Sequence, residues 1–222
     1  GLRVVNTLSW DRDILVNFRC PFAEVKDGIQ IVADGANMPC SVVRDGEDAC
    51  VTFLAKQVTA LGCREFTVLQ KKPDARRTMD VTQTEAGIRC ENARYVAVID
   101  GCGRLTQLLD KQAGKQVLSQ PGNHIKVFLD GPQLEDAWNL NESYMQREIS
   151  IFNSAQTEIT ENGDLRTVIH VHQTGDKVDL HQDIIFYHDN ARIDFVTSVD
   201  WQERNKVMRV YFPAALHAPY YT

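Results

Sequence analysis

The sequence lacks the features that mark several large classes of protein. No window approaches the roughly 18 uninterrupted apolar residues of a membrane-spanning helix. It contains no Gly-x-Ser-x-Gly motif, no phosphate-loop lysine motif and no His-Glu-x-x-His pair. No signal peptide is visible, because residues 1–5 already form a strand-like run. Since the first residue is Gly1 and not Met, we expect a segment of a longer protein.

Positive charge is neither abundant nor concentrated. The chain carries 30 acidic against 24 basic residues, for a net charge of −6. Its densest basic group comprises Lys71, Lys72, Arg76 and Arg77. A nucleic-acid surface gathers basic side chains on one face to meet the phosphates, so we expect no nucleic acid as a partner. A neutral ligand such as a sugar suits this charge, as does any other uncharged molecule.

Closely paired cysteines are missing. The six cysteines all lie in the first half of the chain: Cys20, Cys40, Cys50, Cys63, Cys90 and Cys102. None has a neighbour at zinc-finger spacing, and the first histidine, His124, follows the last of them, which excludes a zinc ribbon or finger. We expect buried free thiols that act as small apolar groups; disulfides remain the alternative if the protein is secreted. The one glycosylation sequon, Asn141-Glu142-Ser143, does not decide between them.

The pattern that fills the sequence is that of β-strands. Short apolar or alternating runs, separated by Asp-Gly turn pairs, occupy residues 14–18, 29–33, 50–54 and 64–69. Regularly spaced strands with glycine-containing turns predict a small β-sandwich at residues 1–72. The charged, proline-containing stretch that follows predicts a linker at residues 73–82.

Longer strands are expected in residues 83–222. Two runs flank Asp100-Gly101-Cys102-Gly103 and predict a hairpin; a dinucleotide-binding loop is excluded because no helix follows. Four further runs with polar turns between them predict an antiparallel meander; they occupy residues 147–160, 165–173, 178–188 and 192–200. Short helices have room only at 106–118 and 133–146. The predicted class is all-β, with a larger antiparallel sandwich at 83–222.

One pair of histidines suggests a metal-binding face. His170 and His172 are two residues apart in a predicted strand, so both imidazoles point to the same side of the sheet. A third ligand could come from His181 or Asp183 on the next strand. The alternative is a polar, solvated sheet face. We adopt this alternative, so the sequence predicts no metal ligands.

Carboxylate pairs matter because glycosidases use two of them around the scissile bond. Asp194 and Asp200 share one face of a strand, but residues six apart on a strand are about 20 Å from each other, too far for a shared task. Asp130 and Asp136 are better placed, because Gly131-Pro132 can turn the chain between them. Trp138 follows, and an aromatic ring beside carboxylates predicts a sugar site. The alternative is a tryptophan that only packs.

Several segments together resemble a known family. They are Val4-Val5-Asn6-Thr7-Leu8-Ser9-Trp10, Ala60-Leu61-Gly62-Cys63-Arg64, Gly103-Arg104-Leu105 with Asp110-Lys111, Asn123-His124-Ile125 with Asp130-Gly131-Pro132 and Asp136-Ala137-Trp138-Asn139, and Arg192-Ile193-Asp194-Phe195 with Val199-Asp200-Trp201, Glu203-Arg204 and Phe212-Pro213. The set resembles glycoside hydrolase family 38, the alpha-mannosidases, in particular its cytosolic and bacterial type. The sequence departs from that pattern at Cys63 (usually aromatic), at Gly131 (commonly lysine) and at Asn139, where the expected aspartate charge is absent.

The resemblance implies a non-catalytic, C-terminal β-region of a retaining, zinc-dependent enzyme that hydrolyses alpha-mannosides. It also implies a galactose-mutarotase-like supersandwich, which we expect to be truncated here. The zinc ligands, nucleophile and acid/base of such enzymes lie in upstream domains, so no catalytic or metal residue is carried over, no cofactor is expected in this chain, and the chain alone should be inactive. We expect Asp130, Asp136 and Trp138 to form a loop that completes the sugar pocket.

The expected partners are the chain's own catalytic domain and an alpha-mannoside or glycan. We expect no membrane and a cytoplasmic location for the parent, and truncated strand edges could cause self-association. Two other functions stay open: a free-standing carbohydrate-binding module, and a structural or interaction β-protein.

Overall fold

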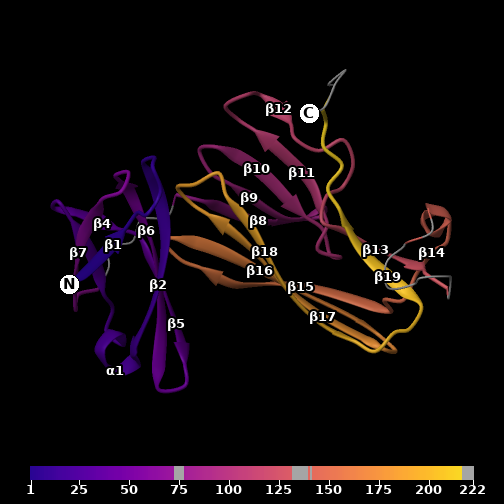
Figure 1. Cartoon of the computed structure of the whole chain (residues 1–222), viewed down its shortest axis with the longest axis horizontal. Coiled ribbons are helices and arrows are strands. Elements are labelled where there is room, and N and C mark those ends of the chain that lie inside the picture. Colours follow the sequence, from indigo (N-terminus) through magenta and orange to yellow (C-terminus); the bar gives the residue numbers. More distant parts are fainter. Residues whose placement is uncertain (73–77, 132–139, 141, 217–222) are drawn as a thin grey trace. The chain divides into compact units, whose positions relative to one another are not determined.

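The computed structural model describes residues 1–72, 78–131, 140 and 142–216, which are mostly antiparallel strands joined by turns (Figure 1). It divides into two compact units. Unit 1 comprises Gly1–Thr78 and Asn162–Arg166, and unit 2 comprises Met79–Glu161 and Thr167–Thr222. Residues 73–77 of the predicted linker lie outside the described residues, and the domain boundaries predicted from the sequence remain a prediction.

Unit 1 is a small β-sandwich. One sheet has the strand order β1-β7-β3-β4 and the other β2-β6-β5. The bounds are β1 Leu2–Val5, β2 Arg12–Pro21, β3 Gln30–Ala33, β4 Ala36–Met38, β5 Cys40–Asp45, β6 Asp48–Val58 and β7 Cys63–Leu69, with the short helix α1 at Phe22–Val25. Phe53 of β6 and Phe66 of β7 meet edge to face, with ring centroids 5.0 Å apart. Apolar side chains of both sheets therefore share one core.

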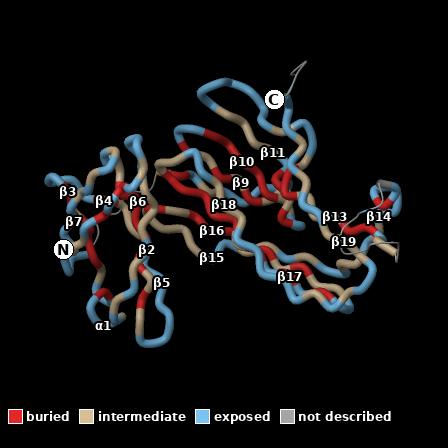
Figure 2. The backbone as a smooth tube through the Cα atoms, in the orientation of Figure 1, coloured by how far each residue is buried: buried red, intermediate tan, exposed pale blue. Residues whose placement is uncertain are grey.

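Unit 2 is built on two larger antiparallel sheets. The first has the order β12-β11-β10-β9-β8 and the second β15-β16-β17-β18. The bounds are β8 Asp80–Thr84, β9 Gly87–Glu91, β10 Tyr95–Ile99, β11 Leu105–Asp110, β12 Lys115–Gln116, β15 Ser154–Asn162, β16 Arg166–Gly175, β17 Val178–Tyr187 and β18 Ile193–Trp201. Every residue of β10 is buried, as its unbroken apolar run predicts. Ile99 packs in one cluster with Ile169 and Phe186, so side chains of the two sheets form a common core. Figure 2 shows the buried positions along β10 and β16 in red.

A third, smaller sheet holds the chain that leads into the predicted sugar loop. Its order is β14-β13-β19, with β13 at His124–Leu129, β14 at Glu148–Ile149 and β19 at Lys206–Tyr211. Phe128 of β13 contacts Tyr144 of the 3-10 helix η1 (Glu142–Gln146) at 5.5 Å and Tyr211 at 6.3 Å between ring centroids. These ring contacts fix the end of β13.

The all-β fold and the antiparallel strands predicted from the sequence are confirmed. β10 and β11 form the expected hairpin around the turn at Asp100 to Gly103. The helix considered at 106–118 is wrong, because these residues continue β11 and, after a turn, form β12. Within 133–146, the described part contains the 3-10 helix η1. Among the described residues, no helix is long and apolar enough to span a membrane.

All six cysteines are free, but burial differs from the expectation. Cys90 is buried, three others are intermediate, and Cys63 and Cys102 are exposed. The prediction that all are buried thiols is therefore wrong for these two. Cys102 lies in the turn between β10 and β11, and Cys63 is the first residue of β7, where the strand begins.

Candidate functional site

Asp130, the first residue of the predicted sugar loop, follows the last residue of β13. Its amide donates to the Asn205 carbonyl at 2.8 Å, and the amide of Leu129 donates to the Arg147 carbonyl at 3.0 Å. These two bonds hold the backbone from which the side chain extends. The other two predicted residues of the loop, Asp136 and Trp138, lie outside the described residues.

The Asp130 side chain carries an unsatisfied acceptor. Its Oδ1 atom is buried and has no hydrogen-bond partner among the described residues. Leaving a buried acceptor unpaired costs about 1–3 kcal/mol, and more when it is charged. Such an atom requires an explanation, and a donor from a ligand or from another domain is one that fits. The sequence has Gly131 where a lysine is common in the family that it resembles. Arg147 Nη1 lies 3.7 Å from the position that a Cβ of residue 131 would take, so Arg147 places a positive charge beside this glycine.

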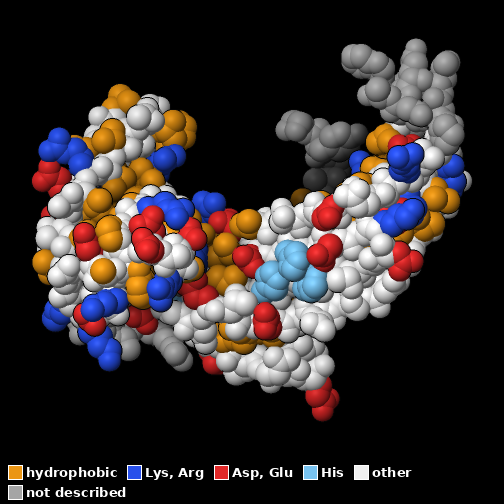
Figure 3. All heavy atoms as spheres, turned by 90° about the horizontal axis from the view of Figure 1, so that it is seen from below, with side chains coloured by type: hydrophobic (Ala, Val, Ile, Leu, Met, Phe, Trp, Pro, Cys, Tyr) orange, Lys and Arg blue, Asp and Glu red, His pale blue; other side chains and the backbone are white. Residues whose placement is uncertain are grey.

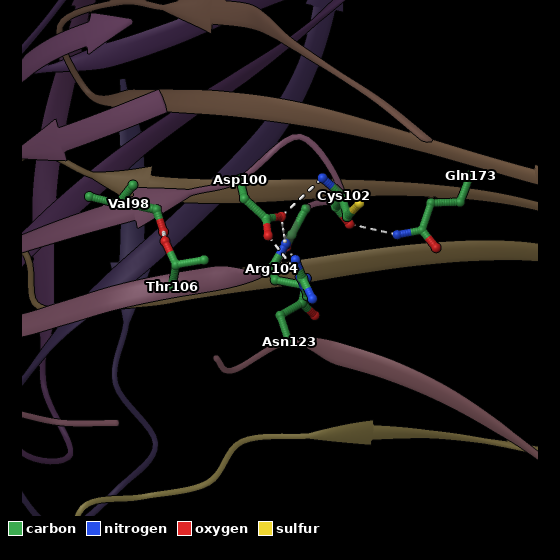
Figure 4. Close-up of polar contacts among 8 residues, drawn as sticks. Val98, Asp100, Cys102, Arg104, Thr106, Asn123 and Gln173 are labelled. Carbon is green, nitrogen blue, oxygen red and sulfur yellow. Dashed lines mark hydrogen bonds and ion pairs between the residues drawn. The ribbon is translucent and has the colours of Figure 1, made fainter. Parts of the chain in front are cut away.

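The turn between β10 and β11 is held by its own aspartate (Figure 4). Asp100 Oδ1 accepts hydrogen bonds from the amides of Cys102 and Arg104, both at 2.9 Å, and Oδ2 accepts from Arg104 Nε at 2.7 Å. Gly103 has φ +78°, and a Cβ there would lie 2.7 Å from Val171 Cγ1. The turn is thus a structural feature that requires both an aspartate and a glycine.

Two amide side chains bond to this turn, and a third supports one of them. Gln173 Nε2 donates to the Cys102 carbonyl at 2.6 Å (Figure 4), and Asn123 Nδ2 donates to the Gly103 carbonyl at 2.8 Å. Asn123 Nδ2 also lies 2.6 Å from Gln182 Oε1. All three amides are buried. They fix the turn against β16 and β17, which carry the histidines.

The histidines considered from the sequence lie together on one face of β16 and β17. In β16, Val171 is buried and the flanking His170 and His172 are partly exposed; in β17, buried Leu180 and Gln182 flank the exposed His181. The alternation of β-strands therefore presents the imidazoles on the outer face of the sheet. Figure 3 shows the histidines as a contiguous group with acidic side chains around it.

These side chains form one continuous set of polar contacts. His170 Nδ1 lies 2.7 Å from Asp183 Oδ1, and His170 Nε2 lies 3.2 Å from His181 Nδ1. His172 Nε2 lies 2.7 Å from Asp179 Oδ1, and the rings of His172 and His181 stack with centroids 4.2 Å apart. The hydrogen bond from His172 holds the pKa of the Asp179 carboxyl below its usual value, so the carboxylate is ionised at neutral pH.

The histidine face borders a recess of about 580 Å³. It is lined by Gly101, Ala155, Gln156, Thr157, Glu158, His170 and His172. The turn of β10 and β11 and the outer face of β15 and β16 therefore meet at this recess. Most of its lining side chains are polar, which suits a hydrophilic ligand.

The carboxylates at the two ends of β18 are not brought together. Asp194 accepts from Tyr187 Oη at 3.0 Å and from Arg192 Nε at 2.6 Å, whereas Asp200 stands opposite Asp179 of β17. This agrees with their separation along the strand. Sequence reasoning missed Asp179, which contacts both His172 and His181. The spacing Asp179-x-His181-x-Asp183 was the signal that would have identified it, because these residues share one face.

The turn at Asp100, Asp130 and the histidine face all lie in a segment of the chain that is similar to known proteins. Residues 90–222 match the profile of the family described as glycosyl hydrolases family 38 C-terminal domain. Alpha-mannosidase G of Dictyostelium discoideum is 32% identical over 130 residues, which cover 55% of this chain and 12% of that protein. Alpha-mannosidase 2C1 of Homo sapiens is 25% identical over 142 residues, which cover 62% of this chain and 14% of that protein. The chain thus spans about an eighth of these relatives.

Proposed function

The chain belongs to the family of glycosyl hydrolase family 38 C-terminal domains, and from this membership we propose that it is the non-catalytic β-region of a retaining, zinc-dependent alpha-mannosidase. In this role the chain supports its own catalytic domain, and the parent enzyme hydrolyses alpha-mannosides. Retaining glycosidases cleave with a nucleophilic carboxylate and a carboxylic acid/base. In the proposal these groups and the zinc belong to the parent's catalytic domain, and the β-region contributes binding and positioning.

One observation carries the proposal. The family profile covers residues 90–222, whereas the similar alpha-mannosidases match over only 12% and 14% of their lengths. Most of each relative therefore lies outside the shared segment, which leaves ample chain for a separate catalytic domain. The six free cysteines support a cytoplasmic parent, because reducing compartments keep thiols unpaired.

We further propose that the loop beginning at Asp130 completes the sugar pocket. The buried, unpaired Oδ1 of Asp130 supports this role, since a sugar hydroxyl would supply the missing donor. Because Asp130 directly follows a strand held by the ring contacts of Phe128, its carboxylate sits on a rigid support. Asp136 and Trp138 belong to the same proposed loop.

The test is the kinetics of the full-length parent enzyme with Asp130→Asn, Asp136→Ala or Trp138→Ala. Losing a hydrogen bond from a sugar hydroxyl to a charged acceptor costs about 1.5–3 kcal/mol, so we expect kcat/KM for an alpha-mannoside to fall about 10- to 100-fold. The matched control is Asp80→Asn, which changes an exposed aspartate on β8 and should leave kcat/KM unchanged. Unchanged catalytic efficiency in all three loop variants, with the fold intact, would refute the loop's role.

A further inference from the structure

The outer face of β16 and β17 carries a second arrangement with its own chemistry. We propose that His172, Asp179 and His181 form a binding site for a divalent metal ion such as Zn²⁺. Each residue offers one ligand atom, and these atoms all lie within 4.8 Å of one another. Two imidazoles and one carboxylate form a donor set that is found in zinc sites, and imidazole ligands also suit nickel and copper ions. This inference goes beyond the proposed function, which assigns no metal to this chain.

The ligand atoms, all within 4.8 Å of one another, can reach a single ion after small movements of the side chains. Two atoms that each lie ~2.1 Å from a tetrahedral zinc ion are ~3.4 Å apart. His181 Nε2 and Asp179 Oδ2 are separated by 3.5 Å, which matches that spacing. His172 Nε2 lies 2.7 Å from the other oxygen, Asp179 Oδ1, which is a hydrogen-bond distance. Binding of the ion therefore replaces this hydrogen bond, and the carboxylate and His172 must shift to share one ion. The rings of His172 and His181 stack with their planes 9° apart, so one ring must also rotate to aim its lone pair at the ion. The side chains of His172 and Asp179 are partly exposed, at 34% and 52%, and have room to move.

A supporting chain of hydrogen bonds fixes the tautomer of His181. His170 Nδ1–H donates to Asp183 Oδ1 at 2.7 Å, which leaves His170 Nε2 as an acceptor. His181 Nδ1–H then donates to His170 Nε2 at 3.2 Å, and the lone pair of His181 Nε2 is left for the ion. Histidine ligands in metal sites donate their other ring N–H in this way, often toward a carboxylate. His170 and Asp183 are therefore positioning residues and not ligands.

The charge of the face also favours a cation. Asp200 of β18 stands directly opposite Asp179 of β17 in the antiparallel register, and both are exposed. Like charges directly opposite each other on a sheet are destabilising unless a cation compensates them. Glu158 and His172 line the adjoining recess of about 580 Å³, so the remaining coordination positions are open to water or to a ligand in that recess.

The experiment is calorimetric titration of Zn²⁺ into the metal-free 222-residue chain, with the cysteines kept reduced. We expect one Zn²⁺ per chain. His172→Ala, Asp179→Asn and His181→Ala should each weaken binding at least about 100-fold. His170→Ala should weaken it about 10- to 100-fold, the loss seen when a supporting hydrogen-bond partner is removed. Zn²⁺ should raise Tm in the wild type and lose this effect in Asp179→Asn.

Two matched variants separate the proposed site from other metal-binding groups. His124→Ala removes an imidazole on β13, and Cys102→Ser removes the exposed thiol of the neighbouring turn. Both should retain the wild-type dissociation constant. No Zn²⁺ binding by the wild type, binding unaffected by Asp179→Asn and His181→Ala, or binding abolished by Cys102→Ser would each overturn the proposal. This experiment does not measure mannosidase activity, so its outcome is independent of the test of the proposed function.

Discussion

At the scale of single residues, Gly103 shows how closely the two large sheets of unit 2 approach. Its φ of +78° disfavours any side chain, and a Cβ would lie 2.7 and 2.8 Å from the two γ-carbons of Val171. Gly103→Ala should therefore lower the free energy of unfolding by at least about 2 kcal/mol, from backbone strain and overpacking together.

Chemical denaturation measures this change, and Gly101→Ala is its control. Gly101 lies two residues earlier in the same turn, and a Cβ there would meet nothing within 4 Å. We expect its unfolding midpoint to stay close to that of the wild type. Equal destabilisation by the two substitutions would contradict the contact between the turn and Val171.

Thiol reactivity follows from burial at single positions. Burial raises the pKa of the Cys90 thiol to about 12 and that of Cys40 to about 11. Since the thiolate is the reactive form, both should resist alkylation in the folded chain at pH 8, whereas the exposed Cys63 and Cys102 should react first. Peptide mass mapping after brief treatment with iodoacetamide checks this order. Rapid labelling of Cys90 before unfolding would contradict it.

At the scale of elements, Asn6 connects the end of β1 to β6. Its Nδ2 donates to the carbonyls of Trp10, Val58 and Thr59 at 2.7, 3.1 and 3.1 Å, and its Oδ1 accepts from the Leu8 amide at 3.1 Å. Asn6 is only 1% exposed, so Asn6→Ala would leave backbone groups unpaired. Each unpaired buried group costs about 1–3 kcal/mol, and we expect unit 1 to lose stability by at least this amount.

Thermal unfolding of the chain provides the measurement for Asn6. The matched control is Asn37→Ala, at an exposed asparagine of β4. A Tm that falls equally in both variants would show that the Asn6 contacts contribute nothing specific. Through its contacts with Leu8 and Trp10, the Asn6 side chain closes the turn between β1 and β2.

Elements were predictable from the sequence where one periodicity dominates. The meander of β15 to β18 was predictable because polar turns separate its long runs, and parts of β16 and β17 alternate between buried and more exposed residues. The strands within residues 106–118 were not predictable in this way. Leu105, Leu108 and Leu109 have a spacing that a helix would also allow. The pairing of β11 with the buried β10 in the hairpin around Asp100 to Gly103 decides in favour of the strand, so the turn was a better guide than the spacing of the leucines.

The candidate site was predictable in part for a similar reason. Strand alternation placed His170 and His172 on one face, and this is where they lie. The contact of Asp179 with both His172 and His181 depends on the cross-strand register of β16 and β17, which the sequence did not supply. The unpaired Oδ1 of Asp130 could not be foreseen either, because its burial depends on packing by segments distant in the chain.

At the scale of the whole molecule, the chain consists of two β-units, each with its own apolar cluster. Sheets with apolar cores hold loops and turns in place, and functional groups then sit on those loops. The turn of Asp100, the start of the loop at Asp130 and the histidine face are all held in this way in unit 2. This organisation is compatible with the proposed role, in which the chain positions groups for chemistry performed in another domain.

In the proposed function, these 222 residues support a mannoside-cleaving reaction without performing it. The most direct measurement is the release of p-nitrophenol from p-nitrophenyl α-mannoside by the purified chain, with Zn²⁺ present and the full-length parent assayed beside it. We predict turnover by the parent and none above the uncatalysed rate by the chain. Turnover that increases in proportion to the concentration of the isolated chain would contradict the claim.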